Sequence, residues 1–390
     1  QYVYLREAFG PLCGLLYGWT LFLVIQTGTI AAVAVAFAKF TGVFLPWFSA
    51  GNDLLSAGGL RISTQQALAI GIIALLTWIN TRGIRTGALV QNIFTVAKTG
   101  ALLGLVGLGL LAARNADAVA ANFHDFWRGA DWSFTTIRLV GVAMVGALFA
   151  SDAWNNVTFT AGEVRNPRRD IPLALVLGVA IVSALYIASN FAYLRLLPLE
   201  AIQHAPEDRV GTAAAAQIFG DVSAQLMAAA IMISTFGCTN GLILAGARVY
   251  YAMALDRLFF RSVARLDPRT RAPVVSLVVQ GGWASLLTLS GTYSDLLDYV
   301  IFAVLLFYVL TIIGLFFLRR RRPELERPYR ALGYPFLPAF YIAAALLIEV
   351  LLLIYKPRYT WPGLMIVLAG VPVYFAWRGR LQALRGGRVP

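Results

Sequence analysis

The sequence predicts an all-helical protein that spans a membrane several times, and composition and hydrophobic patterning support that fold class. Of its 390 residues, 59% are hydrophobic and only 13% are charged, and the mean hydropathy is +0.72. A soluble domain carries about 25% charged residues. Apolar stretches long enough to cross a bilayer recur along the chain. The chain is therefore expected to form one transmembrane domain over residues 1–390.

Ten apolar stretches are predicted to cross the lipid bilayer as helices, because about 20 apolar helical residues match the thickness of its hydrocarbon core. The second and seventh are short, and the fourth has a polar interruption near its middle. In chain order the stretches are Pro11–Ala38, Ala67–Ile79, Val90–Leu111, Leu139–Ala161, Leu173–Leu194, Val222–Ala247, Val274–Leu289, Leu296–Leu318, Pro335–Tyr355 and Trp361–Ala376.

The distribution of basic residues predicts how the stretches are oriented. With Gln1 in the cytoplasm, about 22 of the 32 basic residues fall in inside segments and about eight in outside segments. The densest group, Arg319–Arg322, directly follows the eighth stretch. Positive residues favour the cytoplasmic side, so both ends of the chain are expected there, in a cell inner membrane.

Several function classes are not expected. The net charge of +13 is typical of nucleic-acid binding, but these basic residues lie between apolar stretches, so no nucleic-acid partner is predicted. Cys13 and Cys238 both lie inside predicted spans, which disfavours a structural disulfide. No motif for a metal, a phosphate loop or a catalytic nucleophile is present. We therefore predict no enzyme activity, metal or cofactor.

The fourth stretch carries the strongest functional signal. Apolar residues lead up to Phe149 and Ala150, and Ser151, Asp152 and Trp154 follow. A carboxylate at membrane depth is costly and by default marks a function, and no second carboxylate is expected at this depth. Serine and aspartate favour helix starts, so the helix is predicted to stop after Phe149 and restart near Trp154. An interrupted helix leaves backbone carbonyls and amides that bind the charged ends of a small zwitterion.

Other polar residues lie at membrane depth. Lys98 is about ten residues from either end of the third stretch, a distance that makes reaching the surface awkward and favours a functional role over a structural one. Thr27 belongs to a small polar group that either lines a pocket or serves helix packing. Thr235, Cys238 and Asn240 form a similar group in the sixth stretch, for which a pocket edge is favoured over close packing.

At these residues the chain resembles a known family. Residues 149–155, then Glu163, residues 166–169 and residues 171–172 resemble the sixth helix and following loop of the amino acid–polyamine–organocation superfamily. The most similar branch is the L-type amino acid transporters and their bacterial relatives. Further matches run along nearly all of the chain, at residues 4–11, 91–98, 246–254 and 322–330.

This resemblance implies a LeuT-like fold of twelve helices built from inverted repeats. The first stretch here looks like the third helix of the family, so about ten helices are expected and the first two of the family are not found in residues 1–390. Either the gene product is truncated or upstream residues were left out. The missing first helix would supply about half of an amino acid site.

The resemblance also implies roles for single residues. Carbonyl groups near Phe149, Ala150 and Asp152 would receive the amino group of the substrate, and Phe149 would gate the site. Trp154 and Asn155 would shape the restarted half-helix.

The same resemblance assigns a group next to the site. Lys98 would stand where sodium-coupled relatives bind an ion, so this chain is not expected to depend on sodium. Thr235, Cys238 and Asn240 would face that lysine and the substrate. No cysteine occurs between Thr41 and Gln65, so no disulfide-linked heavy chain is expected.

The predicted function is secondary-active transport of amino acids by alternating access, as a sodium-independent exchanger or a proton-coupled permease. Two alternatives stay open at this point. A permease for polyamines or other amines would use the charge of Asp152, and a membrane sensor would bind amino acids without moving them. A channel is disfavoured because no continuous polar stripe follows several stretches.

Overall fold

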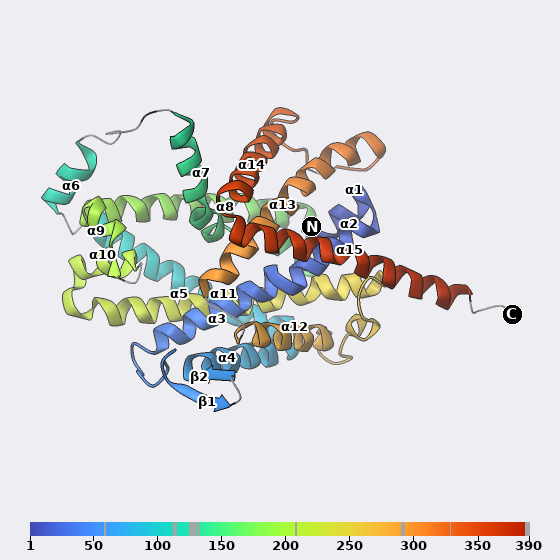
Figure 1. The fold of residues 1–390 in the computed structure, drawn as a ribbon, viewed down its shortest axis with the longest axis horizontal. Helices are drawn as coiled ribbons and strands as arrows, with labels where there is room; N and C mark the ends of the chain where they lie inside the picture. Colours follow the sequence, from blue (N-terminus) through green and yellow to red (C-terminus); the bar gives the residue numbers. More distant parts are fainter. Residues whose placement is uncertain are drawn as a thin grey trace.

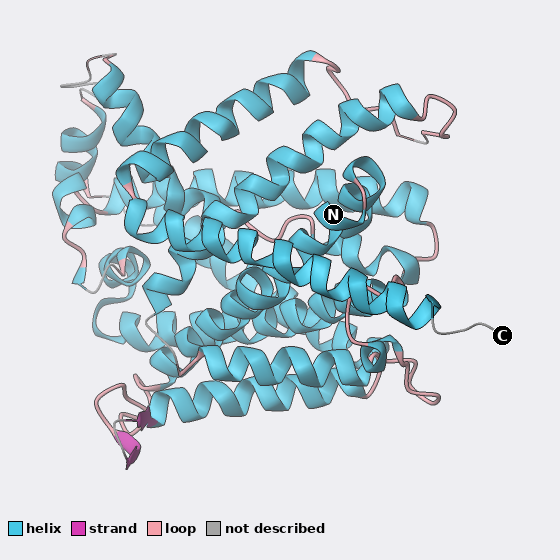
Figure 2. Ribbon diagram, turned by 45° about the vertical axis from the view of Figure 1, so that its right-hand side comes forward, coloured by secondary structure: helices cyan, strands magenta, loops and turns pink. Residues whose placement is uncertain are grey.

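In the computed structural model, the described residues are 1–57, 60–111, 115–124, 131, 133–206, 209–289, 293–327 and 329–386. Side chains are described within these ranges except at 57, 60, 145, 149, 293–299, 359 and 378–386. Helices dominate, and many of the long ones run roughly along one direction, whereas α7, α13 and α14 are inclined to it (Figures 1 and 2). One two-stranded antiparallel hairpin, Asp53–Ala57 with Leu60–Ser63, lies among the described residues at the edge of the bundle.

The elements follow one another with short connections. In chain order they are α1 (Tyr2–Phe9), α2 (Pro11–Thr20), the π-helical stretch η1 (Leu21–Ile25), α3 (Gln26–Thr41), β1 (Asp53–Ala57), β2 (Leu60–Ser63), α4 (Thr64–Thr81), α5 (Ile84–Leu111), α6 (Ala116–Phe123), α7 (Phe134–Ala150), the 3-10 helix η2 (Asn156–Glu163), α8 (Pro167–Leu196), α9 (Leu199–Gln203), α10 (Val210–Phe219), η4 (Gly220–Val222), α11 (Ser223–Leu255), η5 (Arg261–Ala264), α12 (Val274–Leu287), α13 (Tyr293–Arg321), α14 (Phe336–Tyr355) and α15 (Pro357–Gly386).

The helical membrane class predicted from composition is confirmed. Each of the ten predicted stretches overlaps a helix. Among the described residues, seven helical segments are long and apolar enough to span a membrane, and Phe134–Leu148 and Val274–Leu287 are shorter apolar helices. The helix over the second stretch, α4, has 18 residues and is not among the seven. The count of ten spans therefore stays a prediction.

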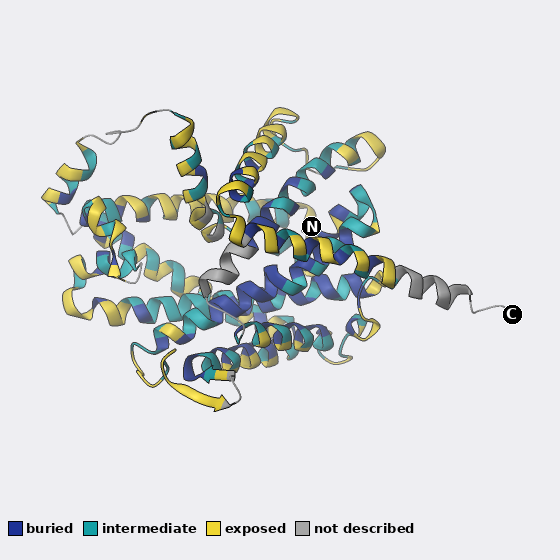
Figure 3. Ribbon diagram, viewed as in Figure 1, coloured by how far each residue is buried: buried dark blue, intermediate teal, exposed yellow. Residues whose placement is uncertain are grey.

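The centre of the bundle is formed by α3 packed along α11, and both helices show mostly buried residues there (Figure 3). A β-carbon on Gly246 of α11 would overlap the side chains of Gln280 and Gln26. Small residues allow such close helix contact inside a membrane. The Gln26 amide donates a hydrogen bond to the Leu242 carbonyl oxygen over 2.8 Å, so a polar side chain joins the two central helices.

Asn240 joins three helices at a buried junction. Its side-chain amide donates to the Gly87 carbonyl oxygen at 3.0 Å and to the Gln91 side-chain oxygen at 3.2 Å, both on α5. Its own oxygen accepts a hydrogen bond of 2.9 Å from Asn80 on α4. Asn240 is fully buried. This side chain, which we predicted to edge a pocket, therefore ties α4 and α5 to α11.

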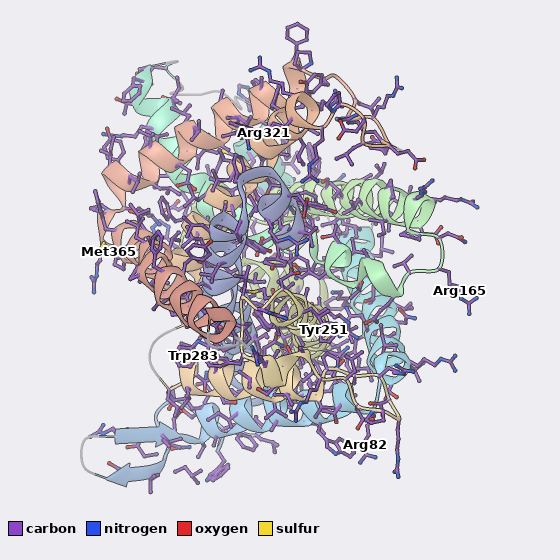
Figure 4. The ribbon with its side chains drawn as sticks, turned by 90° about the vertical axis from the view of Figure 1, so that its right-hand side faces the viewer. Arg82, Arg165, Tyr251, Trp283, Arg321 and Met365 are labelled. Carbon is purple, nitrogen blue, oxygen red and sulfur yellow. The ribbon has the colours of Figure 1, made fainter. Side chains whose placement is uncertain are left out.

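Ion pairs connect the helices at the arginine-rich end of the bundle. Arg6 pairs with Glu7 and Asp256, and Arg322 reaches the other Glu7 oxygen at 2.9 Å. Hydrogen bonds from Arg6 lower the pKa of Glu7. These pairs link α1, α11 and α13 at this end, which Figure 4 shows face on with Arg82 and Arg165 near its edge.

A first prediction concerns the buried junction. Asn240→Ala removes three hydrogen bonds between helices and is expected to destabilise the fold by about 1–3 kcal/mol. Asn190→Ala is the matched control, because the exposed Asn190 amide donates only within its own helix, and its expected cost is below about 0.5 kcal/mol. Thermal unfolding in detergent measures the stability of both variants. A melting temperature of Asn240→Ala equal to that of the wild type would contradict the role of this junction.

Candidate functional site

The fourth apolar stretch is interrupted close to the predicted position. Helix α7 ends at Ala150, residues 151–155 form turns, and η2 begins at Asn156. Ala153 has a φ of 64°, a left-handed conformation that costs energy for a residue with a β-carbon. The left-handed turn residue Ala153 thus stores backbone strain next to Asp152, as is common at functional sites.

The segment after the break differs from the expected half-helix. It is a 3-10 helix of eight residues, Asn156–Glu163, instead of an α-helix starting near Trp154. Its sequence, NVTFTAGE, contains β-branched residues and glycine, which are poor α-helix formers. Arg248 of α11 holds the far end of η2 by an ion pair of 3.0 Å with Glu163.

Nearby hydroxyl groups donate hydrogen bonds to some of the backbone carbonyl groups at the end of α7. Tyr186 of α8 donates a hydrogen bond of 2.7 Å to the Ala150 carbonyl oxygen. Ser151 donates back to the Ala147 carbonyl oxygen at 2.9 Å. Serine often bonds to the preceding helical turn in this way, so Ser151 terminates α7 and does not cap a new helix.

Asp152 is tied to α13 through a tyrosine. The Tyr308 hydroxyl donates to Asp152 Oδ1 at 2.9 Å and lies 3.4 Å from Asn155 Oδ1. The Asn155 amide in turn donates to Gln1 Oε1 at 2.9 Å. The rings of Trp154 and Tyr308 lie 5.6 Å apart, within the range of favourable aromatic pairs. Tyr308 therefore fixes the polar residues of the break as one group.

Asp152 borders three cavities on different sides of the break. The first has a volume of about 20 Å³, which is room for about one water molecule. It lies between Asp152 and the central helix α3, and Gln26 and Thr29 of α3 line it. A second, of about 630 Å³, lies between residues 150–154 and α8. A third, of about 170 Å³, lies against α13 and α14. The second cavity has the volume of a small-molecule site.

Lys98 lines a further cavity of about 320 Å³ between α5, α8 and α11. Tyr186 and Val182 of α8 border both this cavity and the 630 Å³ cavity at the break. Tyr186 is thus the side chain that stands between Lys98 and the Ala150 carbonyl group. Cys238 of α11 is a free, partly buried cysteine that lines none of these cavities.

The other predicted site residues lie farther from the break. Thr27 is buried and donates to the Phe22 carbonyl oxygen within its own helical segment. Thr235 donates to the Ile231 carbonyl oxygen at 2.7 Å. Neither residue, nor Asn240, lines any of the four cavities. The side chain of Phe149 lies outside the described residues.

Two tyrosines that border the break, Tyr186 and Tyr308, were not predicted from the sequence. Of the polar group at residues 26–29, predicted either to line a pocket or to serve packing, Thr27 was singled out, whereas Gln26 and Thr29 line the cavity. Gln26 and Thr29 flank Thr27 in the same polar group, and the π-helical stretch Leu21–Ile25 rotates the helix just before them. Such stretches are frequent at functional sites. The two tyrosines stand in apolar stretches, where an aromatic residue usually indicates packing.

Relatives of this chain are transport proteins. It is 30% identical over 389 residues to the serine/threonine exchanger SteT of Bacillus subtilis, covering 97% of this chain and 82% of SteT. It is 31% identical over 336 residues to the b(0,+)-type amino acid transporter 1 of the rabbit Oryctolagus cuniculus, covering 85% of this chain and 64% of that relative. The human b(0,+)-type amino acid transporter 1 is 30% identical over 388 residues, covering 96% of this chain and 73% of that relative.

The match to a protein family extends over almost the whole sequence. Residues 1–376 match the family described as amino acid permease. This range includes the described helices α1 to α14, most of α15, the interrupted helix and the cavities around Asp152. The chain belongs to the amino acid permease family of the amino acid–polyamine–organocation superfamily.

Proposed function

We propose that this protein moves amino acids across the membrane by alternating access and exchanges one amino acid for another without sodium. The observation that carries this proposal is the interrupted helix, where Asp152 and the end of α7 border a cavity of about 630 Å³. The family and the printed names of its relatives, amino acid transporter and serine/threonine exchanger, support the same function. The alternative mode of transport is proton-coupled uptake of amino acids, and measurements of uptake into proteoliposomes distinguish it from exchange.

The break supplies groups of the right chemistry for the amino group of a substrate. The Asp152 carboxylate and the last carbonyl groups of α7 attract an ammonium ion, because charge-assisted hydrogen bonds are about twice as strong as neutral ones. Tyr308 holds the carboxylate in place. Trp154 and Asn155 shape the far side of the site through Tyr308, and Phe149 is proposed as the gate.

Lys98 is proposed as the coupling group. An ammonium group fixed between α5, α8 and α11 supplies a positive charge at membrane depth. Such a charge disfavours a sodium ion at the same place. Tyr186 lines the cavity of Lys98 and donates a hydrogen bond to the Ala150 carbonyl group at the break. A substrate bound near Asp152 and the charge of Lys98 would therefore both affect the position of the Tyr186 side chain.

Membrane placement follows from the arginines. We propose an inner-membrane protein whose arginine-rich end faces the cytoplasm, since basic residues concentrate on that side. Within a LeuT-like fold of inverted repeats, residues 1–390 would correspond to the third to twelfth helices. The two cysteines, Cys13 and Cys238, are free and lie in helices α2 and α11, so no disulfide-linked heavy chain is proposed.

One alternative substrate class has an observation in its favour. The Asp152 carboxylate also suits amines that lack a carboxylate, such as polyamines. The names of the relatives all point to amino acids instead, and a sensor that binds without transport has no such support. Amines therefore serve as the comparison substrates in the test.

Uptake into proteoliposomes tests the proposed function. The protein would be reconstituted and given labelled amino acids and polyamines, with or without unlabelled amino acid inside, a sodium gradient and a pH gradient. Exchange predicts uptake that needs internal amino acid and ignores sodium. Uptake driven only by an inward proton gradient would replace exchange by proton coupling, and uptake of polyamines alone would overturn the amino acid assignment.

Asp152→Asn is expected to weaken substrate binding while leaving the fold intact. Asparagine keeps the hydrogen bond from Tyr308 but loses the charge, and a hydrogen bond to a charged group contributes about 1.5–3 kcal/mol. The apparent KM for exchange should rise about 10–100-fold. The exposed Asp221 supplies the matched control, Asp221→Asn. An unchanged KM in the Asp152 variant would remove this carboxylate from the site.

Lys98→Ala is expected to abolish transport without preventing insertion into the membrane. The variant removes the positive charge from the 320 Å³ cavity and leaves the break intact. Arg85→Ala, on the exposed surface of the same helix α5, is the control and should transport normally. The measurement is initial exchange rate in proteoliposomes with equal protein content. Normal exchange by Lys98→Ala would exclude a coupling role for Lys98.

A further inference from the structure

Three exposed arginines lie where the turn between α4 and α5 touches the loop between α11 and α12. Arg82 belongs to the turn, and Arg269 and Arg271 lie in the loop on either side of Thr270. A β-carbon on Gly83, the residue after Arg82, would lie 3.4 Å from the Thr270 carbonyl oxygen, so the turn and the loop are in contact. Among the residues that the structure describes, none of the three arginines forms an ion pair. We call these three residues the arginine cluster.

The loop that carries two of these arginines is fixed by its own hydrogen bonds. The Asp267 side chain accepts hydrogen bonds from the backbone amides of Thr270 and Arg269 at 2.8 and 2.9 Å, and these bonds lower the pKa of Asp267. The Arg271 amide donates to the Asp267 carbonyl oxygen at 2.9 Å, and the Asp267 amide donates to the carbonyl oxygen of the buried Ala272 at 2.9 Å. A ligand that binds the arginines therefore does not have to order the backbone of the loop.

Arg271 has a backbone conformation that favours glycine. Its φ is 57°, in the left-handed region that costs energy for a residue with a β-carbon. A loop that only had to be positive would place its arginines at ordinary backbone positions and glycine here. Strained residues persist mostly where their side chains serve a function, so the Arg271 guanidinium group is itself expected to bind a ligand.

Two helices begin beside the arginine cluster and add to its positive potential. Helix α5 begins at Ile84, two residues after Arg82, and α12 begins at Val274, three residues after Arg271. The first amide groups of a helix have no partner within the helix, and together with the helix dipole they attract anions. Asp267 is the single acid of residues 257–273, so the three arginines and this aspartate keep a formal charge of +2.

The arginine cluster lies at the end of two packed apolar helices. Helices α4 and α12 run side by side (Figure 1), and a β-carbon on Gly281 would lie 2.6 Å from Thr77 Oγ1. Beside this contact, Trp78 of α4 is 54% exposed and Val278 of α12 is 55% exposed. The Arg82 guanidinium lies 4.5 Å from the Trp78 ring centre. The helices whose ends carry the arginines thus also present an exposed apolar surface for acyl chains.

We propose that the arginine cluster binds the phosphate group of an anionic membrane phospholipid whose acyl chains lie against α4 and α12. Guanidinium groups bind phosphate through paired, charge-assisted hydrogen bonds. Tryptophan is typical of the headgroup level of a bilayer, and Trp78 lies under Arg82. A soluble phosphate would use the charges but not the apolar surface, which favours the lipid. The inference rests on the proposed membrane placement, which puts the cluster at the cytoplasmic leaflet, and it is independent of the substrate carried.

Native mass spectrometry of the full chain in detergent, with added phosphatidylglycerol or phosphatidylcholine, tests the site. The wild-type protein should bind phosphatidylglycerol more tightly. Each arginine near an anionic lipid contributes about fivefold in affinity. The triple variant Arg82→Gln, Arg269→Gln, Arg271→Gln should therefore bind phosphatidylglycerol about 100-fold more weakly. Equal binding of the two lipids by the wild-type protein would overturn the proposal.

A second triple variant controls for the loss of charge. It removes the same number of exposed arginines from other segments at the arginine-rich end: Arg165→Gln, Arg169→Gln and Arg330→Gln. Because these residues lie outside the arginine cluster, this variant should keep the wild-type affinity for phosphatidylglycerol. An equal loss of affinity in the two triple variants would show diffuse attraction to the whole end of the protein and would overturn the site.

Arg271→Gly separates the role of the side chain from the stability of the fold. Glycine relieves the left-handed backbone, so the melting temperature should equal or exceed that of the wild type, while affinity for phosphatidylglycerol falls about fivefold. Unchanged affinity would contradict the proposal, and so would displacement of the lipid by an equal concentration of glycerol 3-phosphate. None of these measurements needs transport, so the lipid site stands or fails separately from the proposed function.

Discussion

Every backbone polar group inside a lipid bilayer needs a partner within the protein, and the interrupted helix at residues 150–156 is where this requirement is hardest to meet. Two tyrosines meet it from opposite sides: Tyr186 donates to the carbonyl group of Ala150, and Tyr308 donates to the Asp152 carboxylate. Each tyrosine comes from a long apolar helix, α8 or α13. The positions of both helices are thus linked to the break, and a substrate that competes for these groups acts on both helices.

The rest of the bundle divides into a scaffold and elements that surround the break. In the scaffold, buried amides cross between helices, as Gln26 does from α3 to α11 and Asn240 from α11 to α5. Such bonds leave little freedom to slide. Around the break, α7 packs on α14 through apolar contacts, with Leu148 against the cluster that contains Ala345 and Gly141 against Leu351.

The sequence was sufficient for the helical class and for the location of the break, because hydrophobic length and a carboxylate within an apolar run are both local signals. It did not predict which member of a polar group faces a cavity. Thr27 was chosen, yet Gln26 and Thr29 line the cavity, since a π-helical stretch changes the rotation of the helix. Asn240 lies in a tight junction because its partners come from helices distant in sequence. Glu349, a buried acid on α14, was not singled out, because one acid in an apolar helix barely lowers its mean hydropathy.

The central claim is that an amino acid binds at the interrupted helix, and a cryo-EM structure of the protein with a transported amino acid bound tests it most directly. The account predicts density for the substrate beside residues 150–152, with its amino group within hydrogen-bond distance of the Asp152 carboxylate or the carbonyl groups at the end of α7. The break should persist, with Tyr308 still next to Asp152. A bound amino acid elsewhere in the protein, with residues 149–156 forming a continuous α-helix, would contradict the account.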